Sequence, residues 1–362
     1  MPVRVPRLLH AFSTFQAAGP QVRTVALMNA FGADYEHAIL AFDGHLEAAE
    51  RIDSSVPFEL VREPTRAGSV RTVLAMLRLL KREKPDRVLT YNWGAMDAVV
   101  AARILGIPVV HHEDGFRPDE VDGQKARRVL FRRGVLGGCK SIVVPSETLG
   151  RIARDVWKLE ETDVIPNGIH LDRFGHAEGH RRPLRAGLGI APDKLVIGAV
   201  GHLRREKNPL RLVEAFLELE GEPHLVLVGD GPERERLAVA ARPAMSRVHL
   251  VGHQEQPEHW LTTFDVFCLP SDTEQMPVAL LEAMATRLPV AATDVGDVGA
   301  ILPPEQAELV VPRDTAALSQ ALGRLLGDAE LRNRLARANL ERVTERFSFS
   351  AMKAAYRVHW GD

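Results

Sequence analysis

Short runs of Val, Ile and Leu alternate with longer helical patterns along nearly the whole chain, and this alternation constrains the fold most strongly. Strands buried on both faces need such near-continuous apolar runs, and parallel strands need helices to connect them. The pattern occurs once in each half and predicts an α/β protein with two doubly wound parallel sheets. The strand candidates are 7–12, 37–42, 58–63, 87–92, 108–113 and 141–146, then 195–201, 224–231, 248–253, 266–271, 289–295 and 308–312.

The two halves meet in a stretch typical of a linker. Residues 163–174 contain Pro and Gly, and residues 175–189 are polar and basic. A length of 362 residues is comfortable for two domains. We therefore expect Rossmann-like domains over 1–165 and 166–345, facing each other across a cleft, and an amphipathic helix within 346–362. Ligands of such sheets bind beyond the carboxyl ends of the strands.

The composition is that of an ordinary globular protein, with 45% hydrophobic and 26% charged residues. The two cysteines lie far apart and have no metal-ligand or redox spacing, which favours a reducing compartment. The N-terminal sequence lacks the apolar core of a signal peptide, and no apolar run is long enough to span a bilayer. The expectation is a soluble, cytoplasmic protein. The slightly negative net charge of −2 and the lack of an aromatic stacking set beside the basic stretches argue against nucleic-acid binding.

Two stretches are locally basic. Residues 71–84 combine Arg and Lys with apolar residues at helical spacing, and residues 125–140 contain six basic residues and no acid. One interpretation is a solvated helix face, which is what charge runs usually are. The other is a surface for an anionic acceptor or for a membrane.

Two acidic residues stand eight positions apart in "SDTEQMPVALLEAMA", residues 271–285. Pro277 suits the first turn of a helix, so a helix is predicted from about residue 276 to 286, with Glu274 in the preceding loop and Glu282 inside it. The N–H groups of the first turn suit a diphosphate. The inner carboxylate can accept hydrogen bonds from a ribose diol, and the loop carboxylate can reach sugar hydroxyls. The alternative for Glu282 is a helix former paired to an Arg.

Basic residues follow the first strand candidate of the second half. Lys207 stands at a helix start, where its ammonium can project beyond the sheet, and Arg204 and Arg205 add guanidinium groups suited to phosphate. Gly229 and Gly231 form a turn at the end of the next strand, where a backbone can approach a nucleotide. The alternative is a charged, solvated loop and an ordinary turn.

The ordered set of these segments resembles the retaining, nucleotide-sugar-dependent glycosyltransferases of family 4, which have the GT-B fold. The last segment contains that family's pair of glutamates, Glu274 and Glu282, with seven residues between them. The matching segments are "IPNGIHLDRF", "GHLRREKNPLRL", "LVGDGPERERL", "VHLVGHQ" and "LPSDTEQMPVALLEAMATRLPVAATDVG", and together they cover roughly residues 165–300.

The resemblance implies a role for each matching residue. Glu282 holds the ribose, Glu274 faces the donor sugar, Lys207 binds the diphosphate, and the base lies near Val251 and Gly252. Gln275 and Met276 then contribute first-turn amides. The sequence departs from the family pattern in two places. His202 stands where the family has an Arg, and one of Arg204 or Arg205 can then supply the positive charge for phosphate binding. Gln275 stands where the family has a Gly next to the sugar.

The first half resembles the family more loosely. "HAFSTFQAAGPQVRTVAL" matches its first strand and glycine loop, which places Gly19 against the leaving diphosphate. In "VVHHEDGFRPDE", a histidine at the strand end is expected near the reacting centre. His111 is favoured over His112, although strand alternation sends the two to opposite sides. His112, Glu113 and Asp114 are the candidates for gripping acceptor hydroxyls.

The resemblance implies that a sugar moves from a nucleotide diphosphate to an acceptor hydroxyl with retention, without a metal or another cofactor. It also implies that the final helix packs back on the first domain. A divalent metal held by His111, Glu113 and Asp114 is a competing interpretation that the spacing disfavours. Three further functions fit the same two-domain pattern: a phosphorylase of this fold, a nucleotide-sugar epimerase of this fold, and a nucleotide-sugar-binding protein without turnover.

Overall fold

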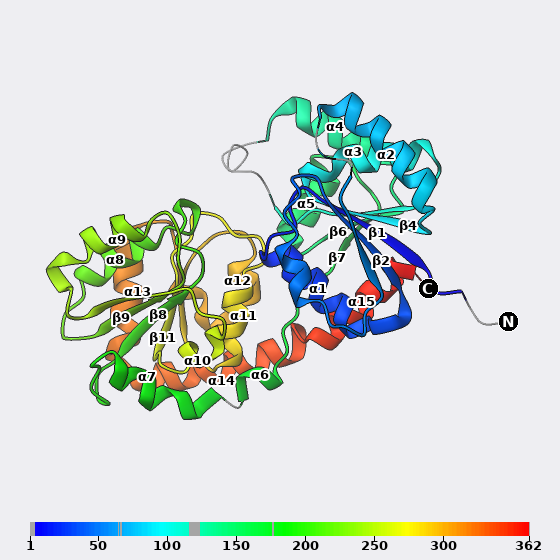
Figure 1. The fold of residues 1–362 in the computed structure, drawn as a ribbon. Coiled ribbons are helices and arrows are strands. Elements are labelled where there is room, and N and C mark those ends of the chain that lie inside the picture. Colours follow the sequence, from blue (N-terminus) through cyan, green and yellow to red (C-terminus); the bar gives the residue numbers. More distant parts are fainter. Residues whose placement is uncertain (1–3, 64, 66, 116–123, 176, 362) are drawn as a thin grey trace. The chain divides into compact units, whose positions relative to one another are not determined.

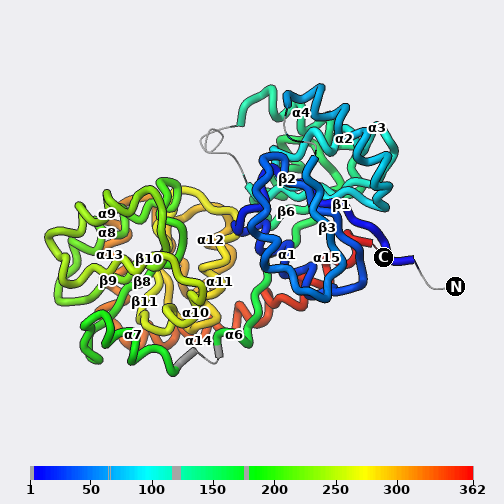
Figure 2. The backbone as a smooth tube through the Cα atoms, in the orientation of Figure 1, coloured from blue at the N-terminus to red at the C-terminus, as the bar shows by residue number. Residues whose placement is uncertain are grey.

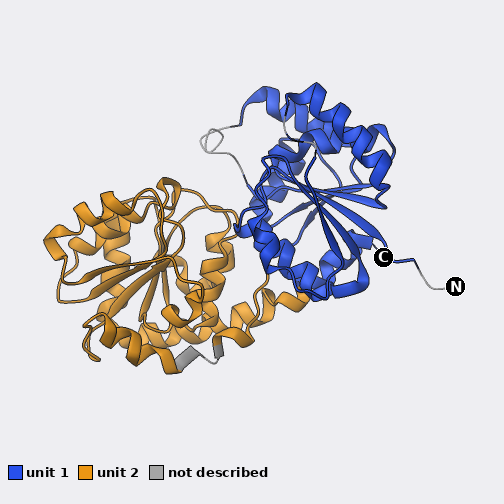
Figure 3. Cartoon of the chain, viewed as in Figure 1, with its two compact units in different colours: residues 1–167, 352–362 blue, residues 168–351 orange. Residues whose placement is uncertain are grey.

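The chain forms two compact units, coloured separately in Figure 3. The computed structural model describes residues 4–63, 65, 67–115, 124–175 and 177–361. Unit 1 comprises residues 1–167 and 352–362, and unit 2 comprises residues 168–351. The sequence placed the boundaries after residues 165 and 345, so the observed units divide two and six residues further along the chain.

Unit 1 is built on a sheet of seven parallel strands in the order β3-β2-β1-β4-β5-β6-β7. The sequence predicted six of these strands. It missed β7, because the three residues Thr-Asp-Val give no apolar run. The strands are β1 (Arg7–Phe12), β2 (Glu36–Ala41), β3 (Phe58–Val61), β4 (Arg87–Tyr91), β5 (Val109–His112), β6 (Ser141–Val144) and β7 (Thr162–Val164).

Helices cover both faces of this sheet, as Figures 1 and 2 show. The α2, α3, α4 and α5 helices pack on one face, where alternate strand residues such as Leu9 and Leu40 join their apolar side chains. The α1 helix and the final helix, α15, pack on the other face, where Trp360 meets Phe31 and His37. The helices are α1 (Gly19–Phe31), α2 (Ser69–Glu83), α3 (Met96–Ile104), α4 (Ala126–Leu136), α5 (Glu147–Asp155) and α15 (Phe349–Gly361), the last belonging to unit 1 from Met352 onward.

Unit 2 repeats the architecture with six parallel strands in the order β10-β9-β8-β11-β12-β13. The strands are β8 (Val196–Val200), β9 (His224–Val228), β10 (Val248–Gly252), β11 (Val266–Leu269), β12 (Val290–Thr293) and β13 (Val310–Val311). Its helices are α6 (Asp172–Gly175), α7 (Arg181–Gly187), α8 (Pro209–Leu217), α9 (Arg234–Ala240), α10 (Pro257–Leu261), α11 (Val278–Ala285), α12 (Val298–Ile301), α13 (Thr315–Gly327) and α14 (Ala329–Arg346).

Both sheets change their winding direction once. In unit 1 the chain leaves β1 for β2 on one side and later returns to place β4 on the other. In unit 2 the corresponding neighbours are β8 and β11. The loops that follow two such strands diverge, so a crevice opens at the carboxyl end of the sheet, where ligands of doubly wound folds bind. The prediction of two doubly wound parallel sheets is confirmed.

Candidate functional site

A cavity of about 200 Å³ lies at the winding switch of unit 2. Its walls come from the strand ends β8, β9 and β11 and from the loops after β8 and β11. Two residues that the sequence singled out, Lys207 and Glu274, line it from these two loops. His202 lines it as well. The topology therefore brings together groups that are far apart in the sequence.

Lys207 and Glu274 form a direct ion pair in this cavity. The ammonium Nζ of Lys207 donates to both carboxylate oxygens of Glu274, each at 2.7 Å. Ser271 also donates its hydroxyl to Glu274 Oε1 at 2.7 Å. The Glu274 side chain is only 6% exposed, whereas that of Lys207 is 39% exposed. The carboxylate is thus held in place by two donors, and the ammonium keeps access to solvent.

A second set of polar contacts holds the two loops against each other. Asn208 adopts a left-handed conformation with φ 41° and caps α8 by accepting from the backbone N–H of Arg211. Its amide nitrogen donates to Asp272 at 3.0 Å, and Arg211 donates to the other oxygen of Asp272 at 2.7 Å. Asn suits this position for two reasons, because it tolerates positive φ and because its side chain caps helices well. The contacts fix the loops that carry Lys207 and Glu274.

The helix after Glu274 begins slightly later than the sequence suggested. It runs from Val278 to Ala285, and Pro277 is the residue before its first turn rather than a member of that turn. Gln275 and Met276 therefore precede the helix, which corrects the predicted source of first-turn amides. Val278 and Ala279, at the start of the helix, line the cavity instead.

Glu282 lies inside this helix with its side chain only partly exposed. Burial raises the pKa of its carboxyl group to about 7, a shift that Arg173 opposes and Glu258 reinforces. Arg173 is itself committed to Glu258, donating to Oε1 at 2.8 Å. The predicted alternative of a structural Glu282–Arg pair is therefore not formed among the described residues. The carboxylate of Glu282 has no hydrogen-bond partner there that would account for its place in an apolar helix.

The basic residues near the cavity have unequal access to it. His202 lines the cavity beside Lys207. Arg204 and Arg205 are exposed and are not among the lining residues, so the structure gives them no contact with the site. Their predicted role in phosphate binding stays a prediction.

Two glycines in unit 2, Gly229 and Gly231, let loops approach one another closely, and Gly252 lies next to them. Gly231 has φ +158°, and a Cβ atom there would lie 2.5 Å from the carbonyl oxygen of Leu203. Gly229 and Gly252 also have positive φ and are joined by a backbone hydrogen bond of 2.8 Å. Loop packing alone therefore explains why a glycine stands at position 231, and its predicted contact with a nucleotide stays a prediction. The base-binding role proposed for Gly252 and its neighbour Val251 stays a prediction.

Gly296 is a site residue that the sequence did not reveal. It has φ +55°, and a Cβ atom there would lie 2.0 Å from the carbonyl oxygen of Glu274. The loop after β12 can therefore rest directly on the backbone of Glu274. Ser271 was missed as well, although its place three residues before Glu274 was a signal that could have been used.

In unit 1 the predicted residues at the end of β5 are mostly inside the protein. His111 is fully buried, with Nδ1 2.8 Å from the hydroxyl of Thr90 and Nε2 3.6 Å from Glu113. Glu113 is also fully buried, with Oε2 3.4 Å from Nε of Arg132. A buried carboxylate of this kind can orient the imidazole, but neither group reaches solvent. The acceptor role of Glu113 and the sugar contact of His111 stay predictions, and both side chains are fully buried in this structure.

His112 points to the opposite face of the sheet, as strand alternation requires. It stacks between Tyr91 and Tyr356 at centroid distances of 4.5 and 5.7 Å. Burial, reinforced by Arg23, lowers the pKa of His112 well below its usual value, so this imidazole is neutral. In this structure His112 lies in the core beneath α15, and its predicted role in acceptor binding stays a prediction.

Asp114 is the one member of the His-His-Glu-Asp run that is not fully inside. It forms a two-pronged ion pair with Arg23 of α1, whose second contact measures 3.0 Å. Arg23 also donates to Asn167 at 3.0 Å. Arg23 is thus a further residue that the sequence did not single out. Gly19, the first residue of α1, is exposed with open space around it, and its predicted contact with a diphosphate stays a prediction.

The described residues contain no group of three His, Cys, Asp or Glu side chains placed to hold a metal ion. Asp114 faces Arg23 and Glu113 faces Arg132, so the three ligands of the competing metal site do not converge. None of the described helices has the length and apolar character needed to cross a bilayer.

Two family models match the chain, one in each unit. Residues 18–168 match "Glycosyl transferase 4-like domain", and residues 194–328 match "Glycosyl transferases group 1". Among curated relatives, the chain is 33% identical over 321 residues to the 2-deoxystreptamine N-acetyl-D-glucosaminyltransferase of Streptomyces fradiae, a match that covers 80% of this chain and 73% of that protein.

A second relative and a solved structure extend the comparison. TuaC of Bacillus subtilis, named for teichuronic acid biosynthesis, is 34% identical over 197 residues, which is 54% of this chain and 48% of that protein. The chain therefore spans less than half the length of that relative. The crystal structure of Anabaena Alr3699/HepE in complex with UDP has a TM-score of 0.82 at 16% identity and covers 98% of this chain and 99% of that one. This likeness shows the two-domain GT-B fold.

Proposed function

Because the chain belongs to the glycosyltransferases with a 4-like domain and a group 1 domain, we propose that it moves a sugar from a nucleotide-diphosphate donor to an acceptor hydroxyl. The observation that carries this proposal is the Lys207–Glu274 pair at the winding switch of unit 2. A cation and a carboxylate side by side are what a charged diphosphate and a polyhydroxyl sugar require of neighbouring groups. The UDP named with the HepE structure, and the UDP-glucose named with another structure of that protein, support a uridine donor as the first to test.

In the proposed complex, each member of the pair exchanges its partner. Phosphate oxygens take the ammonium of Lys207, and sugar hydroxyls donate to Glu274, which Ser271 continues to hold. His202 and the first amides of α11 then stand beside the negative charge that develops as the glycosidic bond breaks. Glu282 accepts the ribose diol. We propose that the reaction needs no metal, because Lys207 and the amides of α11 supply positive charge beside the diphosphate.

We also propose that the anomeric configuration is retained. The bond between the anomeric carbon and the phosphate oxygen breaks, the acceptor oxygen bonds to the same face, and its proton passes to the departing phosphate oxygen. NMR of the product distinguishes retention from inversion by the coupling constant of the anomeric proton.

The acceptor is proposed to belong to cell-envelope or polysaccharide biosynthesis, as the name of the B. subtilis relative suggests for that protein. A surface of unit 1 favours a membrane-bound acceptor. On α4, Leu130 and Phe131 are 71% and 40% exposed beside the exposed Arg127 and Arg133. Apolar side chains among cations are typical of helices that lie on anionic membranes. Arg132 is not part of this surface, because it is buried against Trp93 and Trp157.

Product analysis tests the proposed function against a phosphorylase, an epimerase and a binding protein. The purified chain is incubated with UDP-[¹⁴C]glucose, with and without lipid or saccharide acceptors. The proposal expects labelled product only with an acceptor, and UDP released in equal amount. Epimerisation without an acceptor, or cleavage that requires inorganic phosphate, would indicate an epimerase or a phosphorylase. Binding of the donor without turnover under every condition would indicate a binding protein.

Vesicle binding tests the membrane surface separately. The wild type should sediment with vesicles that contain phosphatidylglycerol and should remain in solution with neutral phosphatidylcholine vesicles. The double variant Leu130→Ser/Phe131→Ser should lose this sedimentation. Equal sedimentation of the variant would remove α4 from the proposal without affecting the donor site.

A further inference from the structure

A second and larger cavity, of about 620 Å³, lies elsewhere in unit 2. It is bounded by α7, α14 and the residues that immediately precede β11 and β12. Since all strands of this sheet are parallel, these residues lie at its amino-terminal edge, opposite to the edge that carries Lys207 and Glu274. The cavity is therefore distinct from the site described above. Its volume falls within the range of about 300–1,000 Å³ that is usual for small-molecule sites.

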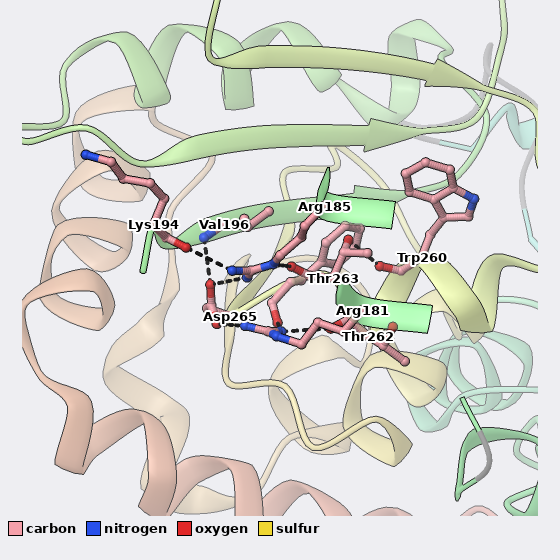
Figure 4. A network of polar contacts seen from close by, with 9 residues as sticks. Arg181, Arg185, Lys194, Val196, Trp260, Thr262, Thr263 and Asp265 are labelled. Atoms are coloured by element: carbon pink, nitrogen blue, oxygen red, sulfur yellow. Dashed lines mark hydrogen bonds and ion pairs between the residues drawn. The ribbon is translucent and has the colours of Figure 1, made fainter. Parts of the chain in front are cut away.

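The charge of this cavity is positive. Its described lining residues include Arg181, Arg287 and Arg332, against Asp265 as the one acid. Asp265 is already neutralised, because Arg181 donates to one of its oxygens at 2.5 Å and Arg185 donates to the other at 2.6 Å (Figure 4). Its carboxylate thus has little capacity left to repel an anion that enters the cavity.

Arg287 is the cation most available to a ligand. Its side chain is exposed, and its guanidinium group has no hydrogen bond or ion pair in the described part of the chain, whereas its backbone N–H donates to the carbonyl oxygen of Met284. Its backbone has φ 58°, a left-handed conformation that arginine adopts only at a cost. Glycine would suit that backbone better, so the backbone alone does not explain an arginine here.

The second cation is held in place by the protein. Arg332 donates from Nη1 to the carbonyl oxygens of Leu325 and Leu326, at 2.6 and 2.9 Å. These bonds engage one nitrogen of a guanidinium group that has five N–H donors. A ligand can therefore meet a preorganised fork at this wall without first ordering the side chain.

The remaining walls are apolar, with Phe174, Leu261, Phe264 and Leu340 among them. We propose that this cavity binds a small organic phosphate, whose phosphate group lies between Arg287 and Arg332 and whose apolar body packs on these side chains. Guanidinium groups offer forked hydrogen bonds that match phosphate oxygens. A purely inorganic anion would leave the apolar walls without a partner.

Calorimetric titration of the full chain with phenyl phosphate tests this proposal. Phenyl phosphate carries a phosphate on an apolar ring and has no ribose or base for the site of Lys207. The test variant is Arg287→Gly, which removes the cation and suits the left-handed backbone, so its melting temperature should be equal to that of the wild type or higher. Loss of a hydrogen bond to a charged group should weaken binding about tenfold or more. Inorganic phosphate should bind the wild type more weakly than phenyl phosphate.

Two control variants locate the binding. Arg334→Gln removes an exposed cation of the same helix, α14, that does not line the cavity, and it should leave the affinity unchanged. Lys207→Ala should also leave it unchanged. Equal affinity in Arg287→Gly, or no saturable binding to the wild type, would overturn the proposal. Loss of binding in Lys207→Ala would show that phenyl phosphate binds in the other cavity. Equal affinity of the wild type for inorganic phosphate would show that the apolar walls do not contribute to binding.

Discussion

The ammonium of Lys207 lies 2.7 Å from both carboxylate oxygens of Glu274, although the two residues are 67 positions apart in the chain. The position of each residue depends on more than the loop to which it belongs. The parallel sheet sets β8 beside β11, so the loops that follow these strands meet at the winding switch. Asn208, Arg211 and Asp272 then hold the two loops together. The pair is therefore a consequence of topology and local capping acting together.

Breaking this pair from the lysine side should cost stability. Lys207→Met leaves Glu274 as a buried carboxylate whose remaining side-chain donor is Ser271, and we expect a loss of about 1–2 kcal/mol in the free energy of unfolding. The double variant Lys207→Met/Glu274→Gln should recover most of it, since the amide needs no counterion. Urea unfolding of the four members of this cycle measures the coupling. Additive losses in the double variant would mean that the two residues do not depend on each other.

Gly296 should be essential because its Cβ position is occupied by the backbone of Glu274. In Gly296→Ala, a methyl group 2.0 Å from a carbonyl oxygen forces the loop after β12 to move. We expect a loss of about 2–4 kcal/mol in unfolding free energy, with weaker donor binding. Gly32→Ala is the matched control, since Gly32 has a similar φ of +57° with no atom within 4 Å of its Cβ position.

The control should cost about 1–3 kcal/mol from its strained backbone of φ 57° and ψ −123° alone. Thermal unfolding of both variants separates the two contributions. Equal losses in Gly296→Ala and Gly32→Ala would show that the contact with Glu274 has no energetic weight.

Glu282 should make the free protein less stable as the pH rises. Its pKa is raised to about 7 from the usual 4.5, so between these values the folded state holds a proton that the unfolded state has released. The protonated Glu282 therefore contributes fully to the free energy of unfolding below pH 4.5. This contribution, of up to about 3 kcal/mol, is lost as the pH rises through 7. Glu282→Gln should become more stable relative to the wild type over this range while binding the donor less tightly.

Unfolding by urea at pH 5 and pH 8 gives the comparison for Glu282. A stability difference between wild type and Glu282→Gln that does not change with pH would contradict the raised pKa. Undiminished binding of the donor by Glu282→Gln would contradict the ribose assignment, whatever the stability data show.

His37 should give unit 1 the opposite pH dependence. Burial lowers the pKa of His37 to about 4, and its Nδ1 lies 3.0 Å from Nε2 of His10. In the unfolded state His37 binds a proton below about pH 6.5, whereas in the folded state it stays neutral. The stabilising contribution of neutral His37 is therefore complete above pH 6.5 and is lost as the pH falls toward 4. The wild type should lose up to about 3 kcal/mol relative to His37→Phe between pH 7 and pH 4. Parallel pH profiles of the two proteins would exclude this contribution.

The sequence was sufficient for the repeated α/β architecture, because buried parallel strands need apolar runs that are visible without any tertiary information. It failed at β7, whose three residues carry no such run. It also identified Lys207 and Glu274, since each follows a strand at the edge where ligands bind. It could not reveal Gly296 or Arg23, because their importance arises from contacts with residues distant in the chain.

The β5 histidines show a different limit. The alternation of a strand separates His111 from His112 but does not say what covers either face. In the structure, helices cover both faces of the unit 1 sheet, so both imidazoles lie in the interior. A polar residue near a strand end reaches the surface only if it lies beyond the last covered position. Here Asp114 is the first residue of the run to do so, and its side chain is still only 10% exposed.

Donor binding at the Lys207–Glu274 cavity is the central claim, and isothermal titration calorimetry with UDP and UDP-glucose tests it most directly. We expect the wild type to bind UDP, and Lys207→Ala and Glu282→Ala to bind it at least tenfold more weakly. Lys194→Ala, which removes a lysine paired with Glu222 on another surface of unit 2, should bind like the wild type. Binding of UDP that is unchanged in Lys207→Ala and Glu282→Ala, or no binding of any nucleoside diphosphate by the folded wild type, would contradict the account.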